Sequence, residues 1–277
     1  MAETFIHPLA VVEKGAELGA GVRIGPFCHV SAEAVLGDGV ELISHATILG
    51  ATTLGARCQV HPTAVLGGAP QNYKHKGGPT VLTIGEGCII REGVTAHRGT
   101  DTSRGRTTIG DNCMLMAYTH VAHDCDVGSN VTMANYACLS GHVTIGDHVI
   151  ISGYAAVHQF VRIGHHAFLA GYAAVVGDLI PYGMAMGDRA KLRGLNVIGM
   201  KRAGMARSEL MQVRRAYRML FSEDRPLAEN IELVRREFPD SAAVRDILDF
   251  MAGRERKYFV LPARGRSLDE DDDPGGD

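Results

Sequence analysis

The residues best suited to do chemistry in this chain are histidines in its middle third. Thirteen histidines occur among 277 residues. His123 is followed directly by Asp124, and His120, His142 and His158 come nearby along the chain. A neutral imidazole near pH 7 suits a general base, and an adjacent carboxylate can orient it and stabilise the imidazolium. We therefore predict that His123 is a general base supported by Asp124.

A six-residue repeat predicts the scaffold that must position these side chains. Stepping by six from Ile6 reaches a Val, Ile or Leu at every position as far as Leu66. The frame resumes at Ile84, breaks again, and continues from Ile109 to Val175. This period fits neither a helix nor a simple alternating strand. It indicates a short strand and a turn, repeated, with one aliphatic side chain pointing inward each time.

The repeat resembles that of the hexapeptide-repeat proteins, in which three repeats form one triangular coil of a left-handed parallel β-helix. By this resemblance we expect a mainly β domain over residues 1–188 with nine or ten coils of 18 residues. Residues 18 apart should then stack about 4.8 Å apart, the usual strand spacing. The three adjacent columns predicted around His123 are 123–141–159 (His, Gly, Gln), 124–142–160 (Asp, His, Phe) and 122–140–158 (Ala, Ser, His).

The columns gather more polar groups than a structural corner needs. His123, His142, His158 and Gln159 should share one small patch. Gly141, one coil from His123, offers a bare backbone N–H for a developing oxyanion. No Ser or Cys is clearly paired with His123 as a nucleophile, so direct transfer is favoured over a covalent intermediate.

Two polar, basic insertions interrupt the repeat near residues 72–83 and 97–108. Loops that leave a rigid solenoid usually line a site. After Pro181 the period ends, and amphipathic segments starting near Ser208, Pro226 and Asp240 predict a helical C-terminal domain over 189–262. We expect residues 263–277 to form a disordered acidic tail.

Charge and composition narrow the function class. Residues 189–266 carry 18 basic and 10 acidic side chains, which suits an acidic partner. No basic patch with interleaved aromatics indicates nucleic acid, and no apolar run approaches the length of a membrane span. The N-terminus has no secretory signal, so a cytoplasmic location is expected. Five cysteines occupy small inward positions and are interpreted as buried hydrophobes: Cys28, Cys58, Cys88, Cys113 and Cys125.

Local motifs narrow the resemblance to one family. The motifs are Pro70-Gln71-Asn72-Tyr73-Lys74, His97-Arg98-Gly99-Thr100, His120-Val121-Ala122-His123-Asp124-Cys125, Ser140-Gly141-His142-Val143, Val157-His158-Gln159-Phe160, Gly194-Leu195-Asn196 and Lys201-Arg202. On these motifs the chain is similar to the bacterial UDP-N-acetylglucosamine O-acyltransferases that begin lipid A synthesis.

The resemblance implies a homotrimer with sites between subunits. It implies transfer of a 3-hydroxyacyl chain from acyl carrier protein to the glucosamine 3-position of a UDP-sugar, with no cofactor of its own. His123, Asp124 and the Gly141 N–H would be catalytic. Contacts to the sugar, the pyrophosphate or the donor would come from Gln71, Asn72, Lys74, His97, His120, His142, His158 and Gln159. Asn196 and Arg202 would hold the nucleotide or the phosphopantetheine end, and Gly171 would lie near the acyl tail.

Alternatives remain open at the level of sequence. Asn72 stands where the family usually has Asp, which leaves room for a 3-amino acceptor and an amide product, and Ala203 stands where a second Arg is common. A second interpretation is an acetyl-CoA-dependent transferase of the same superfamily. A third is a zinc site on His120, His123 and His142, as in anhydrase-like β-helices. A fourth is a β-helix that only scaffolds or binds.

Overall fold

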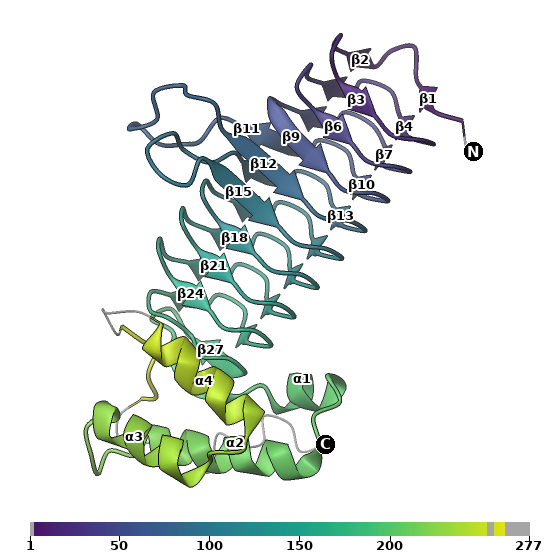
Figure 1. Ribbon diagram of the computed structural model, residues 1–277. Coiled ribbons are helices and arrows are strands. Elements are labelled where there is room, and N and C mark those ends of the chain that lie inside the picture. Colours follow the sequence, from purple (N-terminus) through teal and green to yellow (C-terminus); the bar gives the residue numbers. More distant parts are fainter. Residues whose placement is uncertain (1–2, 254–257, 264–277) are drawn as a thin grey trace.

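The computed structural model describes residues 3–253 and 258–263. Three parallel sheets wind around a common axis to form a long three-sided β-helix, and the helices gather at its C-terminal end (Figure 1). The acidic tail expected over 263–277 lies, beyond residue 263, outside the described residues.

Each sheet is built from strands that lie one coil apart. The first sheet contains β1 (Phe5–Ile6), β4 (Arg23–Ile24), β7 (Glu41–Leu42), β10 (Gln59–Val60), β13 (Ile89–Ile90), β16 (Met114–Leu115), β19 (Thr132–Met133), β22 (Ile150–Ile151), β25 (Phe168–Leu169), β27 (Gly183–Met186) and β28 (Lys191–Leu195). The second contains β2 (Val11–Val12), β5 (His29–Val30), β8 (Thr47–Ile48), β11 (Val65–Gly68), β14 (Thr95–His97), β17 (His120–Val121), β20 (Cys138–Leu139), β23 (Ala156–Val157) and β26 (Ala174–Val175). The third contains β3 (Glu17–Leu18), β6 (Val35–Leu36), β9 (Ala51–Leu54), β12 (Val81–Ile84), β15 (Arg106–Ile109), β18 (Asp126–Val127), β21 (Thr144–Ile145) and β24 (Arg162–Ile163).

The aliphatic residues of the repeat fill the interior as predicted. Leu36, Leu42 and Ile48, from three successive strands, are at most 1% exposed. The five cysteines of the small inward positions are buried as well. Ile6, which starts the series, is 44% exposed because β1 pairs with β4 on one side only among the described residues. Burial of one aliphatic side chain per strand is worth about 1.5–3 kcal/mol each, which makes the stacked aliphatic core the main stabilising feature of a chain with no Trp.

Stacking 18 residues apart is confirmed over the regular coils. His120 pairs with Cys138, and Cys138 with Ala156, in parallel register. The corners between sheets place bulky residues in the left-handed backbone region, as at Asp124 (φ 61°) and His142 (φ 63°). Such φ values are uncommon for residues other than glycine, so the tight corner geometry must outweigh the local cost.

The two insertions differ slightly from the bounds that the sequence pattern indicated: the first lies about three residues earlier, and the second is shorter. β12 begins at Val81 and β15 at Arg106, so the inserted loops are residues 69–80 and 98–105. Both strands have four residues instead of two, and they pair with each other along their whole length. Their polar residues, Thr83 and Thr108 among them, belong to the ladder although they look like loop residues in the sequence.

The β structure also extends past the expected domain limit at residue 188. β27 and β28 form an antiparallel hairpin that continues the first sheet to Leu195. Four helices follow: α1 (Val197–Arg202), α2 (Arg207–Leu220), α3 (Leu227–Glu237) and α4 (Ala242–Ala252). The last three begin within two residues of the predicted starts, and α4 stops at Gly253 as expected.

The short helix α1 was not among the expected helices. Six residues with a glycine in the interior have weak helix propensity, so its formation depends on local contacts. The Asn196 side chain accepts the Gly199 N–H (2.9 Å) and caps the first turn. Met200, a residue of this helix, is fully buried. Within the described residues, no helix is long and apolar enough to cross a membrane.

Candidate active site

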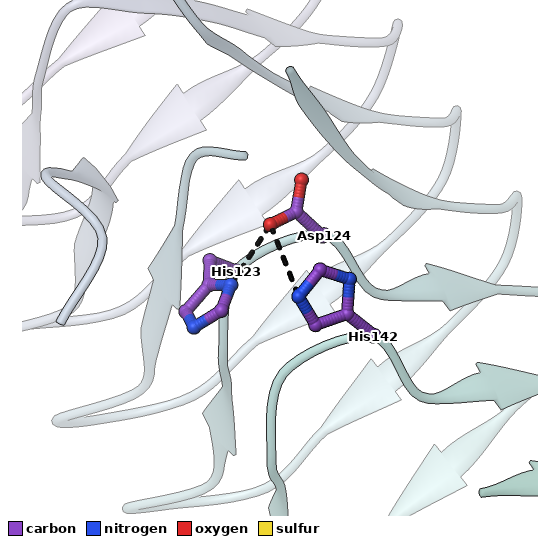
Figure 2. A group of neighbouring side chains, drawn as sticks. All are labelled: His123, Asp124 and His142. Atoms are coloured by element: carbon purple, nitrogen blue, oxygen red, sulfur yellow. Dashed lines mark hydrogen bonds and ion pairs between the residues drawn. The ribbon is translucent and has the colours of Figure 1, made fainter. Parts of the chain in front are cut away.

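His123 and Asp124 lie at the corner that follows β17, where the second sheet turns into the third. His123 Nδ1 is 2.8 Å from Asp124 Oδ2. Figure 2 shows His123 and His142 both directed at the same carboxylate oxygen of Asp124. With the Nδ1 proton donated to Asp124, the lone pair of His123 lies on Nε2, which is the arrangement a general base requires.

Asp124 is held as a buried carboxylate. Its side chain is 0% exposed. The Thr100 N–H donates to Oδ1 (3.0 Å) and the Thr100 hydroxyl donates to Oδ2 (2.7 Å). Burial would raise the pKa of Asp124, but the hydrogen bonds from Thr100 and His123 outweigh it and hold the pKa below its usual range. Asp124 is therefore ionised when His123 needs a counter-charge.

His142 completes the cluster from the next coil. Its Nε2 is 3.7 Å from Asp124 Oδ2, and its ring stacks on Phe160 with centroids 4.6 Å apart. Ser103, in the second inserted loop, lies 3.4 Å from His142 Nδ1. Burial lowers the pKa of His142, with Asp124 acting in the opposite direction. The neutral ring can thus donate or accept a hydrogen bond beside His123.

Gly141 lies directly against the His123 ring, as the predicted column requires. A Cβ added at Gly141 would be 2.6 Å from His123 Cε1, so a side chain at this position would displace the imidazole. Among the described residues, the Gly141 N–H donates to no other group. A free backbone donor next to the base is suited to bind an oxyanion.

The first inserted loop brings Asn72 to the same place. Asn72 Nδ2 is 3.5 Å from His123 Nε2, a long contact to the atom that would remove a proton. The Asn72 side-chain oxygen accepts the Lys74 N–H (2.9 Å). Gln71 and Lys74 are exposed beside it. These side chains are available to an incoming ligand.

His97 and His120 form a second pair next to the cluster. Their rings meet edge to face with centroids 4.9 Å apart. His120 Nδ1 is 2.7 Å from the Thr95 hydroxyl, whereas the buried Nδ1 of His97 has no hydrogen-bond partner. Burial first, and then the neighbouring histidines, lower the pKa of His97 to about 4. His97 is therefore neutral at physiological pH.

Three predicted residues lie farther along the β-helix. His158 is exposed, and its Nδ1 is 3.2 Å from the Gln159 carbonyl oxygen. Gln159 is half-buried in the column of His123. Gly171 stacks on Gly153, whose carbonyl oxygen is 3.5 Å from a Cβ placed on Gly171. The stacking that the sequence implied for Gly171 is confirmed.

Asn196 and Arg202 are not part of the histidine cluster of the same chain. Both line a cavity of about 730 Å³ between α1 and the first sheet. The Asn196 amide donates to the His166 carbonyl oxygen (2.9 Å), and Ala203 also lines this cavity. The cavity walls are largely apolar, with side chains such as Ile150 and Phe168.

The cluster also has the donor set of a metal site. His123, Asp124 and His142 each offer one ligand atom, and these three atoms lie within 4.8 Å of one another. His120, which the zinc alternative needed, is hydrogen-bonded to Thr95 instead. This group of potential ligands differs from the His120, His123 and His142 set of the zinc alternative, because Asp124 takes the place of His120.

Comparison with protein-family models gives two matches. Residues 106–141 match the model of bacterial transferase hexapeptide (six repeats). Residues 178–259 match the model of UDP N-acetylglucosamine O-acyltransferase, domain 2. One match covers part of the β-helix, and the other covers the hairpin and the helices.

Curated relatives cover nearly the whole chain. A protein of Mesorhizobium japonicum, named acyl-[acyl-carrier-protein]–UDP-N-acetylglucosamine O-acyltransferase, is 63% identical over 272 residues, which is 98% of each chain. The chain belongs to this family. A Brucella ovis protein of the same name is 58% identical over 98% of this chain and 100% of its own.

Solved structures of this acyltransferase family share the fold. The UDP-N-acetylglucosamine acyltransferase of Francisella novicida superposes with a TM-score of 0.90 at 33% identity, covering 94% of this chain and 95% of that one. The Campylobacter jejuni enzyme gives 0.87 at 37% identity over 93% and 100%. The expected left-handed parallel β-helix with a small helical C-terminal part is confirmed. The 3-amino, acetyl-CoA and anhydrase-like alternatives are not favoured.

Two residues of this acyltransferase site were not assigned a role from the sequence. Thr100 belongs to a motif that helped to identify the family, but its two bonds to Asp124 depend on how the inserted loop folds. Ser103 lies in the same loop and approaches His142. The signals in the sequence were the insertion itself and, for Thr100, the family motif that contains it.

Proposed function

We propose that this protein transfers a 3-hydroxyacyl chain from acyl carrier protein to the 3-hydroxyl of the glucosamine in UDP-N-acetylglucosamine, the first step of lipid A biosynthesis. The observation that carries the proposal is the His123–Asp124 pair, 2.8 Å apart and anchored by Thr100, in a chain of this family. This pair supplies a base, His123, whose Nε2 faces the Asn72 side chain.

The proposed reaction is one direct displacement. His123 Nε2 takes the proton of the sugar 3-hydroxyl, and the resulting oxygen attacks the thioester carbonyl carbon. The Gly141 N–H stabilises the oxyanion of the tetrahedral intermediate. Collapse breaks the carbon–sulfur bond, and the departing phosphopantetheine thiolate takes the proton from the imidazolium. Asp124 stabilises the imidazolium while it carries this proton. The proton taken from the sugar hydroxyl thus ends on the leaving thiol, and His123 returns to its starting state.

The acceptor would approach from the side of the first inserted loop. Asn72 lies against His123 Nε2, so the sugar 3-hydroxyl would take the place of the Asn72 amide there. Lys74, exposed next to it, suits the pyrophosphate charge. Gln71, His97, His120, His142, His158 and Gln159 would contribute the remaining contacts to the sugar or the donor.

A homotrimer accounts for the position of Asn196 and Arg202. In one chain they line the cavity beside α1 and are not part of the His123 cluster. If neighbouring subunits pack side by side, the nucleotide contacts of one subunit can face the base of another. Residues 189–266, with 18 basic and 10 acidic side chains, suit the acidic acyl carrier protein. We propose no cofactor beyond the carrier's phosphopantetheine, and a cytoplasmic location, where that carrier is found.

The proposed function is tested by offering defined donors and acceptors to the purified protein. UDP-N-acetylglucosamine and its 3-amino analogue are supplied together with 3-hydroxyacyl carrier proteins of several chain lengths, and products are identified by mass. We expect the main product to be an ester of the hydroxyl sugar. Treating the protein with a chelator should not change the rate at which this ester forms. An amide as the main product, transfer only from acyl-CoA, or activity lost with removal of a metal would contradict the proposal.

Mixing two inactive variants tests the shared site. H123A and R202A are purified separately, then combined, unfolded and refolded together. In a trimer with sites between subunits, some clefts receive both intact residues and activity returns. Activity that does not return, with trimers present by light scattering, would contradict a site shared in this way.

A further inference from the structure

A single carboxylate ties the two inserted loops together. Asp101, in the second loop, accepts the Gly78 N–H at Oδ2 (2.9 Å) and the Lys76 N–H at both oxygens (3.2 and 3.0 Å). His75 Nδ1 lies 3.0 Å from Asp101 Oδ1. The side chains of His75 and Asp101 are only 11% and 19% exposed. Asp101 is therefore the point where three residues of the first loop, His75, Lys76 and Gly78, are fastened to the second loop.

The fastening requires an ionised carboxylate and a glycine. The Gly78 N–H is the main reason that the pKa of Asp101 lies below its usual range. An amide at this position would keep one acceptor oxygen and turn an N–H group toward the N–H groups of the first loop. A Cβ at Gly78 would be 2.7 Å from the Asp101 Cβ, so the loops could not approach as closely.

Both ends of this connection reach the His123 cluster. In the second loop, Thr100 precedes Asp101 and donates its two hydrogen bonds to Asp124. In the first loop, the His75 N–H donates to the Asn72 carbonyl oxygen (3.0 Å), and the Asn72 amide faces His123 Nε2. A shift of the first loop would therefore move Asn72 and leave the His123–Asp124 pair in place.

We propose that Asp101 is a positioning residue, which holds the loop carrying Asn72 and Lys74 at the acceptor side of His123. The inference rests on the proposed function, since it assumes that this loop binds the sugar nucleotide. Asp101 acts through His75, Lys76 and Gly78, and the base keeps its own anchor through Thr100. Loss of Asp101 then weakens acceptor binding far more than it slows the chemical step.

The test compares D101N and D101A with the unchanged protein in steady-state assays that vary the UDP-sugar at saturating acyl donor. We expect KM for the sugar to rise about 10- to 100-fold, with kcat changed by less than about threefold. D101E keeps both oxygens and should recover part of the lost affinity. A merely structural role would lower the folded fraction and would not separate KM from kcat.

D111N is the matched control. Asp111 also accepts a backbone N–H from the neighbouring coil, that of Glu86 (2.7 Å), but at a corner without histidines of the cluster. KM should not change in D111N. If D101N does not fold, H75A removes only the side-chain part of the connection and must itself raise KM.

The outcomes separate the two proposals. If D101N and H75A leave KM unchanged while N72A and K74A raise it, the role of Asp101 is wrong and the proposed acceptor site stands. If D101N lowers kcat at constant KM, the positioning role is also wrong. If N72A and K74A leave KM unchanged as well, the acceptor site of the proposed function is wrong, and the inference falls with it.

Discussion

Two corners of the β-helix have the same backbone conformation but serve different purposes. We call them the site corner and the tyrosine corner. Both place residues with side chains at φ near 60° in successive coils. The site corner consists of Asp124, His142 and Phe160, and the tyrosine corner of Tyr118, Tyr136, Tyr154 and Tyr172. The four tyrosine rings stack with centroids 4.8–5.1 Å apart.

The difference between the corners is what covers them. The tyrosines are 46–72% exposed, and Phe160 at the far end of the site corner is 51% exposed, whereas Asp124 under the loop is 1% exposed. The loop of residues 98–105 folds over the site corner and donates to Asp124 through Thr100. A buried carboxylate that keeps its charge can orient a base, and an exposed stack of rings cannot. The corner geometry therefore sets the positions of the side chains, and the inserted loops turn one set of these positions into a buried site.

The largest expected effect is loss of the base. H123A should lower kcat/KM about 10²- to 10⁴-fold, because proton removal from the acceptor then depends on water. The matched control is H45A, a histidine nearer the N-terminus with a left-handed backbone (φ 52°) and a ring that packs at a tilt against Phe27, with centroids 4.8 Å apart. Initial rates with both variants check this. Equal activity of H123A and H45A would contradict the assignment of His123 as the base.

Acid should destabilise the covered region through His97. Its pKa is lowered to about 4 by burial, so this neutral histidine contributes stability above the unfolded pKa near 6.5. That contribution is lost as pH falls from about 6.5 through 4, and it amounts to roughly 3 kcal/mol at most. Urea unfolding at pH 7 and pH 4.5 measures the loss. H97N should show a smaller loss than the unchanged protein, and an equal loss would contradict the assignment.

A methyl group beside the base should cost less than removing it. In G141A the new Cβ would be 2.6 Å from His123 Cε1, so the imidazole must move. We expect kcat to fall about 10- to 100-fold with little change in melting temperature. G153A, one corner away and 3.3 Å from the nearest atom, should keep most of its activity. The expectation fails if the two variants lose activity equally.

The smallest effect is expected at the tyrosine corner. Y154A removes a ring stacked on both neighbours, which should lower the free energy of unfolding by about 1 kcal/mol. Y154G loses the same contacts but relieves the left-handed backbone (φ 59°), so it should be the more stable of the two. Thermal unfolding of both variants gives the order. Y154A more stable than Y154G would show that the backbone strain at this corner is small.

Much of the scaffold could be predicted because its rules are local. The hexad aliphatics define which side chains point inward, and the 18-residue coil places Gly141 against His123 and His142 against Phe160. The hairpin of β27 and β28 and the helix α1 could not, since neither has a repeat or a strong propensity. Their formation depends on pairing with β25 and on the Asn196 cap.

The site divides in the same way. The sequence determined that His123 and Asp124 are neighbours and that Gly141 and His142 stack on them, because stacking follows from a fixed residue count per coil. Tertiary structure decided that Thr100 and Asp101 fasten the two loops over that corner, and that Asn196 and Arg202 lie in a separate cavity. The inserted loops have no period to set their path, so only the hydrogen bonds they make on folding determine where they lie.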